Sequence, residues 1–203
     1  MKQNAIIYFV VFICGAIVMS FEILGSRVLA PNFGSSVFVW GSLISVFLTG
    51  LSAGYYLGGM FADMAPSSRK LGLMIVVPGA LFLGFPLYSG PISDWIFMKD
   101  FGVRISPLLA STALFLLPSI FLGFVSPYTA KLMICSHLTS GKTIGTLYAL
   151  STFGSIIGTL LTSFYLITVA GVNTLIVAQG AMLVAIAVPL FFMRLQCRTV
   201  PDM

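Results

Sequence analysis

The stretch Gly15–Gly34, GAIVMSFEILGSRVLAPNFG, holds the features on which the fold of this chain depends. It begins inside an apolar run, Ala5–Leu24, that is long enough to cross a bilayer. One carboxylate, Glu22, lies near the far end of that run, and Arg27 follows it. A Gly34-Ser35-Ser36 turn then separates the run from the next apolar segment. The stretch predicts a membrane helix with a charged residue inside it.

Glu22 is the residue that needs explaining. An ionisable side chain at the centre of a membrane helix costs about 2.5–3.5 kcal/mol on insertion scales, so it usually has a partner or a purpose. Three interpretations are open: Glu22 is hydrated at the interface, is buried and paired with Arg27, or lines a cavity. It is the only acidic residue within a predicted span, which makes it the natural counter-charge for an amine.

Composition defines the class of protein. The chain has 203 residues, of which 59% are hydrophobic and only 7% are charged, and its mean hydropathy is +1.09. Soluble domains are typically about 25% charged. The net charge of +5 comes from basic residues that stand singly between apolar runs, so they indicate topology. The composition predicts an integral membrane protein in contact with a lipid bilayer and no nucleic-acid partner.

The apolar runs predict a single all-α domain over residues 1–203, a bundle of six membrane-spanning helices. The predicted spans are 5–24, 37–61, 71–89, 106–128, 145–169 and 175–193. The mixed segment 91–105 is expected to lie along the membrane interface, with Trp95 at the level of the lipid headgroups.

The distribution of basic residues predicts the orientation. With both termini in the cytoplasm, the cytoplasmic side carries Lys2, Arg69, Lys70, Lys131, Lys142, Arg194 and Arg198, and the outside carries Arg27, Lys99 and Arg104. The positive-inside rule favours this assignment.

Small residues recur at four-residue spacing in the second and fifth spans. Gly50, Gly54 and Gly58 share one helix face, and Gly154 and Gly158 share another. These faces serve tight helix packing or, alternatively, face a solute. They occupy corresponding places in two three-helix halves, and halves with an odd number of helices would be inverted repeats, as in many transporters.

The loop after the second span, Gly58–Lys70, resembles the cytoplasmic loop of the major facilitator superfamily, in which an aspartate and basic residues lock one side of the transporter. Asp63, Arg69 and Lys70 match that loop by role, whereas Pro66-Ser67 replaces its internal glycine. The alternative is a positive-inside turn with Asp63 capping a helix.

No catalytic constellation can be assembled from the chain. Its single histidine and its three cysteines, Cys14, Cys135 and Cys197, have no metal-ligand spacing, and no structural disulfide is expected. No glycine-rich dinucleotide or S-adenosyl binding motif follows a strand. The sequence therefore predicts no catalytic residue, no metal and no cofactor, and not an enzyme acting alone.

Two stretches, 19–59 and 148–167, resemble the membrane domain of bacterial membrane-fused spermidine synthase-like proteins, a facilitator-like part joined to an aminopropyltransferase domain. The residues that carry the resemblance are Glu22, Arg27, Pro31, Gly34, Trp40, Gly54, Tyr56, Gly58, Pro127, Gly145, Tyr148, Ser151, Gly154 and Thr159. No aminopropyltransferase residues are present, so the resemblance transfers none. It implies a bacterial inner-membrane protein about half the size of a twelve-helix transporter.

The expected function combines these points. The chain is expected to be a membrane subunit that binds or passes a small cationic solute such as a polyamine, together with a separately encoded synthase-like partner. A homodimeric small-solute transporter and a structural membrane anchor are the alternatives. The candidate site is built around Glu22, with Arg27, Trp40, Tyr56, Tyr148, Ser151 and Thr159 as its other members.

Overall fold

The computed structural model describes residues 2–64, 66–134 and 140–193. Its elements are α1 (Lys2–Phe33), α2 (Val37–Asp63), α3 (Ser68–Lys99), α4 (Ile105–Ile134), α5 (Ser140–Leu161), the π-helical turn η1 (Thr162–Leu166), α6 (Ile167–Val169) and α7 (Val172–Phe192). The elements α5, η1 and α6 follow one another without a break and form one span. In the described part of the chain, six helices are long and apolar enough to cross a membrane, which confirms the all-α six-helix fold.

The helix α3 is longer than the third predicted span. It continues through Pro91 to Lys99, so most of the segment 91–105 extends a membrane helix, and only residues 100–104 connect it to α4. Proline removes one backbone donor and leaves the rest of the ladder intact, and packed neighbours hold the helix together. Ser93 and Ile96, both beyond Pro91, are buried. The turn itself is made by Asp100 and Gly102, both with positive φ.

The helix α1 likewise continues past the predicted end at Leu24 and ends at Phe33, with Pro31 inside it. Arg27 therefore lies on the same helix as Glu22 and not in a connecting loop. The angle between the two side chains is consequently fixed by helix geometry.

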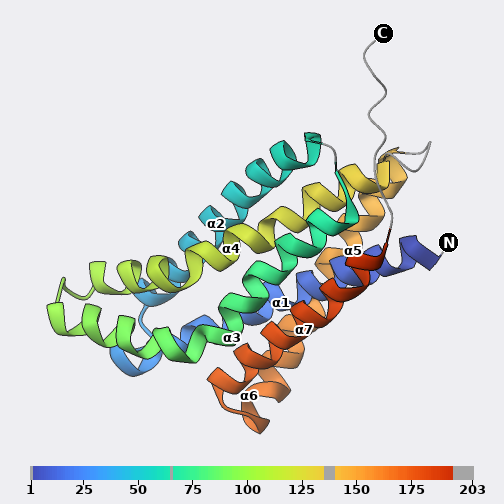
Figure 1. The fold of residues 1–203 in the computed structure, drawn as a ribbon. Helices are drawn as coiled ribbons and strands as arrows, with labels where there is room; N and C mark the ends of the chain where they lie inside the picture. Colours follow the sequence, from blue (N-terminus) through green and yellow to red (C-terminus); the bar gives the residue numbers. More distant parts are fainter. Residues whose placement is uncertain (1, 65, 135–139, 194–203) are drawn as a thin grey trace.

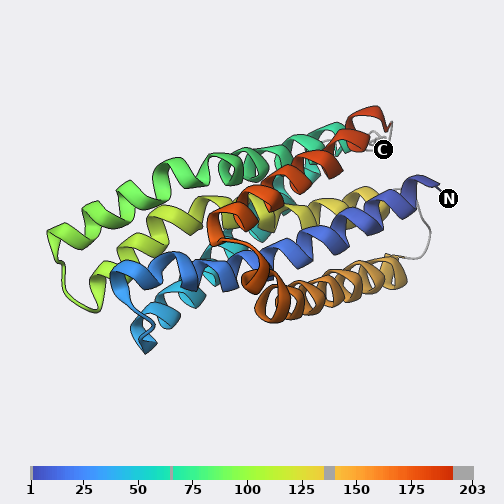
Figure 2. The same cartoon turned by 90° about the horizontal axis from the view of Figure 1, so that it is seen from below.

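The six spans pack mainly as three pairs. The helix α2 lies along α4, α5 lies along α1, and α3 lies along α7 (Figures 1 and 2). The first three spans can be exchanged with the last three in order, α1 with α4, α2 with α5 and α3 with α7. This exchange converts the α2–α4 pair into the α5–α1 pair, and it leaves the α3–α7 pair unchanged. This exchange is compatible with two three-helix halves, and their inversion stays a prediction.

The predicted glycine faces lie in these pairs. A Cβ atom on Gly54 would meet the carbonyl oxygen of Ile120 and lie 2.8 Å from Cα of Gly123, both on α4. A Cβ atom on Gly158 would meet the backbone of Ala16 on α1. Gly50 and Gly58 meet α4 in the same way, and Gly154 meets α1 at Phe12. These faces are packing surfaces, which is the first of the two alternatives open from the sequence.

The centre of the bundle is aromatic and anchors α1. Phe21 is fully buried, and its ring lies 4.1 Å from that of Phe82, 5.2 Å from that of Phe115, and 5.6 Å and 5.8 Å from those of Phe47 and Phe85, measured between centroids. Because adjacent helical residues point about 100° apart, this anchor sets the direction of the next side chain along α1, Glu22.

The two ends of the bundle differ. The start of α1 and the end of α7 lie at the same end, as an even number of spans requires (Figure 1). At the opposite end, called here the outer end, the α3–α4 turn projects well beyond the turn between α6 and α7 (Figures 1 and 2). Arg194 and Arg198, two of the residues used to predict the orientation, lie outside the described residues.

Candidate functional site

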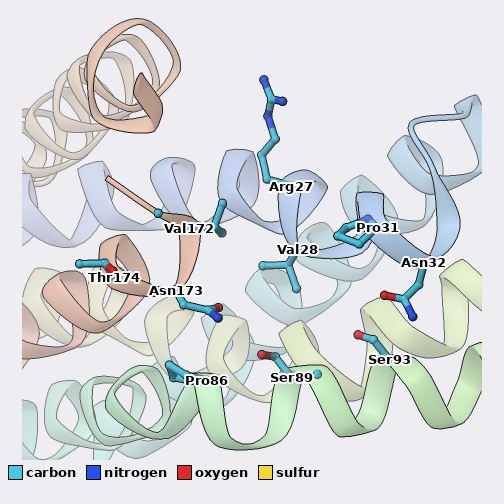
Figure 3. A pocket seen from close by; sticks show the side chains of 12 residues that line it. Arg27, Val28, Pro31, Asn32, Pro86, Ser89, Ser93, Val172, Asn173 and Thr174 are labelled. Atoms are coloured by element: carbon cyan, nitrogen blue, oxygen red, sulfur yellow. The ribbon is translucent and has the colours of Figure 1, made fainter. Parts of the chain in front are cut away.

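Glu22 is half-buried on α1, and no described residue gives it a hydrogen bond or an ion pair. The predicted pair with Arg27 is not formed. The two residues are five positions apart, which places their side chains about 140° apart around the helix axis. Arg27 is exposed and projects away from α3 and α7 (Figure 3).

A small cavity of about 100 Å³ lies between α1, α2, α4 and α5 and is called here the four-helix cavity. Its lining consists of Val11, Cys14, Gly15, Val18, Met19, Leu51, Tyr55, Leu122, Val125, Ser126, Ser151 and Ser155. The helix α2 packs along α4, and α5 packs along α1. The cavity lies where these two pairs meet. The cavity brings together hydroxyl groups from three helices.

Glu22 belongs to the face of α1 that lines this cavity. Positions 11, 15 and 18 line it, and 22 is the next position of the same stripe, because a helix returns to one face every three or four residues. The carboxylate therefore lies about one turn from the cavity, toward the outer end. Glu22 itself is not among the residues that line the cavity, so it lies beside it.

Three predicted residues of α5 also lie at or beside the cavity. Ser151 lines it, and the half-buried Thr159 is two turns further along the same face. Tyr148, one turn before Ser151, lines an adjoining crevice with Val11 and Ser126. The structure thus groups Ser151, Thr159 and Tyr148 near the Glu22 face.

Trp40 and Tyr56, in contrast, do not line the four-helix cavity. Both are on α2 and exposed, Trp40 by 39% and Tyr56 by 71%. The tyrosine that does line it is Tyr55, which the sequence analysis missed. The position of Tyr55 could have been inferred from the glycine face of α2. Tyr55 follows Gly54, so its side chain points about 100° away from the contact with α4.

The hydroxyl groups of the cavity are partly engaged. Ser155 Oγ lies 3.1 Å from the carbonyl oxygens of both Gly15 and Ser151, so it links α5 to α1. A Cβ atom on Gly15 would lie within 3.0 Å of Ser151 Oγ, which places that hydroxyl group against α1. Carboxylate and hydroxyl oxygens and tyrosine rings are the groups that bind ammonium ions. They do not form a nucleophile–base pair.

In the loop that resembles the facilitator loop, the ion-pair partner of Asp63 comes from α4. Asp63 Oδ1 pairs with Lys131 Nζ of α4 at 2.7 Å, and Lys70 Nζ donates to the Met64 carbonyl oxygen at 2.7 Å. Arg69 is exposed. Because both partners of the Asp63–Lys131 pair are largely exposed, it contributes about 0–1 kcal/mol.

A buried tyrosine gives this loop a second anchor. The Ser67 backbone N–H donates to the Tyr128 hydroxyl oxygen at 3.0 Å, and Tyr128 is fully buried in α4. Ser67 Oγ in turn accepts from the Lys70 backbone N–H at 3.4 Å and caps α3. The sequence analysis missed Tyr128 and used Lys131 only to predict orientation, because their contacts depend on α4 being next to α2.

A polar cluster joins three spans near the middle of the bundle. Ser20 Oγ on α1 lies 2.5 Å from Thr162 Oγ1, and it accepts from Gln179 Nε2 of α7 at 2.5 Å. Thr162 opens the π-helical turn η1, and such turns occur frequently at functional sites. Gln179 Oε1 is buried without a hydrogen-bond partner. Sequence analysis gave no signal for this cluster beyond three scattered polar residues.

The fold places the chain among the multi-pass α-helical membrane proteins. No protein-family model matches the chain, and neither a curated protein nor a solved structure matches it. The resemblance to the membrane domain of spermidine synthase-like fusions thus stays a prediction.

Proposed function

We propose that this chain is the membrane component that binds a small cationic solute, an amine of the polyamine class, at Glu22 and the four-helix cavity. One observation carries the proposal. Glu22 is a half-buried carboxylate without a described partner, on the face of α1 that lines a cavity with hydroxyl groups. A carboxylate in that position needs a counter-ion, and an ammonium group supplies one.

The depth of Glu22 supports a role inside the membrane. Arg27 and Val28 line a pocket together with the first turn of α7, so they lie at the outer end of that helix. Glu22 is five to six residues further in, which is about 8 Å along α1. Headgroup hydration therefore does not account for Glu22 as well as a cavity does.

The size of the cavity limits the solute. A volume of about 100 Å³ suits an ammonium group with a few methylene groups more than a whole polyamine. An extended amine would place one charged end near Glu22 and continue toward the outer end or between α2 and α5. The resemblance to synthase-like fusions favours such an amine over an inorganic cation.

The test is amine binding by the purified chain. Thermal unfolding in neutral detergent is measured with increasing spermidine, against sodium chloride at equal ionic strength and against an uncharged diol of similar length. Wild-type protein is expected to show a saturable rise in the unfolding midpoint with spermidine alone. Glu22→Gln should lose that rise.

Asp100→Asn is the matched control. Asp100 is an exposed carboxylate at the outer end with φ 45°, a conformation that asparagine also tolerates. This variant should respond to spermidine like the wild type. A spermidine response that survives in Glu22→Gln, or that Asp100→Asn abolishes equally, would contradict the proposal.

The proposed partner is a separately encoded synthase-like protein, and the alternative is a second copy of the chain. Purification in mild detergent with measurement of the particle mass separates them. A stoichiometric soluble protein of aminopropyltransferase sequence supports the subunit role, and a clean dimer supports the homodimeric transporter. A monomer without solute binding would leave the structural anchor.

A further inference from the structure

A second pocket lies at the outer end of the bundle, away from the four-helix cavity. It has a volume of about 430 Å³ and is bounded by α1, α3 and the first turn of α7 (Figure 3). Its polar lining comes from Arg27 and Asn32 of α1, Ser89 and Ser93 of α3, and Asn173 and Thr174 of α7. The pocket contains none of the residues assigned above to the amine site except Arg27, which is not paired with Glu22.

The start of α7 supplies unused backbone donors. The first backbone N–H of this helix that bonds within the turn is that of Leu175, which donates to the Gly171 carbonyl oxygen at 3.0 Å. Gly171, the N-cap residue, has no side chain to accept from the N–H groups of the first turn, and that turn contains no acidic residue. The positive end of the helix dipole is therefore uncompensated at the pocket.

An independent feature points to a ligand at the same place. Ser93 is 3% exposed, and its Oγ has no hydrogen-bond partner in the structure. Figure 3 shows the Ser93 and Ser89 hydroxyl groups directed from α3 toward α1, into the pocket. A buried hydroxyl group without a partner is unfavourable, and a ligand acceptor would satisfy it.

The charge of the pocket selects an anion. Arg27, whose guanidinium group lies outside the pocket in Figure 3, is the only charged residue among those that line it, and no carboxylate lines it. Asp94, which is not among the lining residues, accepts a hydrogen bond from Asn32 Nδ2 at 2.8 Å. A guanidinium group, a helix N-terminus and serine hydroxyl groups are the donors that hold phosphate in proteins.

The depth of the pocket matches a phosphate layer. The helix α7 has 21 residues and is about 32 Å long, close to the roughly 30 Å of a hydrocarbon core. Its first turn therefore lies at the level of the lipid headgroups. We propose that this outer pocket binds a phosphate group, held by the α7 N-terminus and Ser93. The guanidinium group of Arg27 points away from α3 and α7 in Figure 3, and this exposed side chain would turn toward the phosphate on binding.

The experiment measures thermal unfolding of the full chain in a phosphate-free neutral detergent, with two probes. One arm compares sodium phosphate with sodium chloride at equal ionic strength. The other compares phosphatidylglycerol with a diacylglycerol of the same acyl chains, which lacks the phosphate. A saturable rise of the midpoint in the lipid arm alone identifies a headgroup, and a rise with sodium phosphate identifies a free phosphate group. The absence of a saturable rise in both arms would overturn the proposal.

Variants locate the binding. Arg27→Gln should raise the dissociation constant for phosphate about tenfold or more, because it removes a charge-assisted contact. Ser93→Ala should raise it less. Arg104→Gln is the matched control, since Arg104 is at the same end, lies over the Phe38 ring at 5.4 Å and does not line the pocket. Arg27 is exposed, so its variant should fold. Equal binding by Arg27→Gln and Arg104→Gln would contradict the assignment.

Discussion

Glu22 and Arg27 illustrate what helix geometry decides at the scale of single residues. Their spacing of five was visible in the sequence, and an unbroken helix through both places them on different faces. The pairing hypothesis placed both residues at the outer end of the first span. Because α1 continues without a break to Phe33, their side chains point about 140° apart. Glu22 then lies about one turn beyond the four-helix cavity on the same helix face, and Arg27 borders the outer pocket.

The first prediction concerns the independence of these two charges. Glu22→Gln and Arg27→Gln should change the free energy of unfolding additively, to within about 0.3–0.5 kcal/mol, because the residues share no described partner. Chemical or thermal unfolding of the wild type, both single variants and the double variant in detergent measures the coupling. A buried pair would show itself as a double variant that recovers a large part of the single losses.

The second prediction separates the members of the buried polar cluster. Ser20→Ala removes the partner of both Thr162 and Gln179, and each unpaired buried group costs about 1–3 kcal/mol. Gln179→Leu keeps the Ser20–Thr162 contact and removes an acceptor, Oε1, that has no partner. Ser20→Ala should therefore lower the unfolding midpoint clearly, whereas Gln179→Leu should leave it close to that of the wild type. A larger loss for Gln179→Leu would show that its amide is fully used.

At the scale of helices, apolar length predicted the number and order of the spans, and spacing predicted the glycine faces. The extent of α3 was not predicted, because Pro91 and the charged residues after it were taken as a stop. Packing overrides that signal where Ser93 and Ile96 are buried. Neither the η1 turn nor the role of Tyr128 could be predicted, since both depend on which spans become neighbours.

The third prediction uses two glycines of one helix. Gly54→Ala should destabilise the protein, because the added methyl group would meet the Ile120 carbonyl oxygen and lie 2.8 Å from Gly123 Cα. Gly41→Ala, also on α2, adds the same methyl group where no atom lies within 4 Å. It should be neutral or stabilising by up to about 1 kcal/mol, from helix propensity. Folded yield after solubilisation and the unfolding midpoint measure both. Equal effects would place the Gly54 face against lipid.

At the scale of the whole molecule, the two candidate sites lie at different depths and differ in predictability. The carboxylate at the centre of the amine site was a sequence signal, because an acidic residue in an apolar run is rare. The outer pocket gave no such signal. It requires α1, α3 and the first turn of α7 to converge, and residues 27, 93 and 173 are far apart in the chain.

The fourth prediction concerns orientation. The positive-inside rule places both termini in the cytoplasm, and the structure puts the start of α1 and the end of α7 at one end. A reporter at Met203 and another inserted at Gly102, in the connection after α3, should report opposite sides of the membrane. Gly102 is preferable to any site between 91 and 99, where an insertion would interrupt α3. Two reports from the same side would rule out this topology.

The unequal outer ends have a consequence for the surrounding lipid. The helix α3 has 32 residues and is about 48 Å long, whereas α7 is about 32 Å long. The projecting α3–α4 tip exposes Phe97, Met98, Phe101, Val103 and Ile105 beside the charged Lys99, Asp100 and Arg104. Its apolar side chains reach hydrocarbon only where the bilayer thickens on that flank or the molecule tilts. Either distortion costs elastic energy, which two copies would reduce by sharing one thickened patch of membrane.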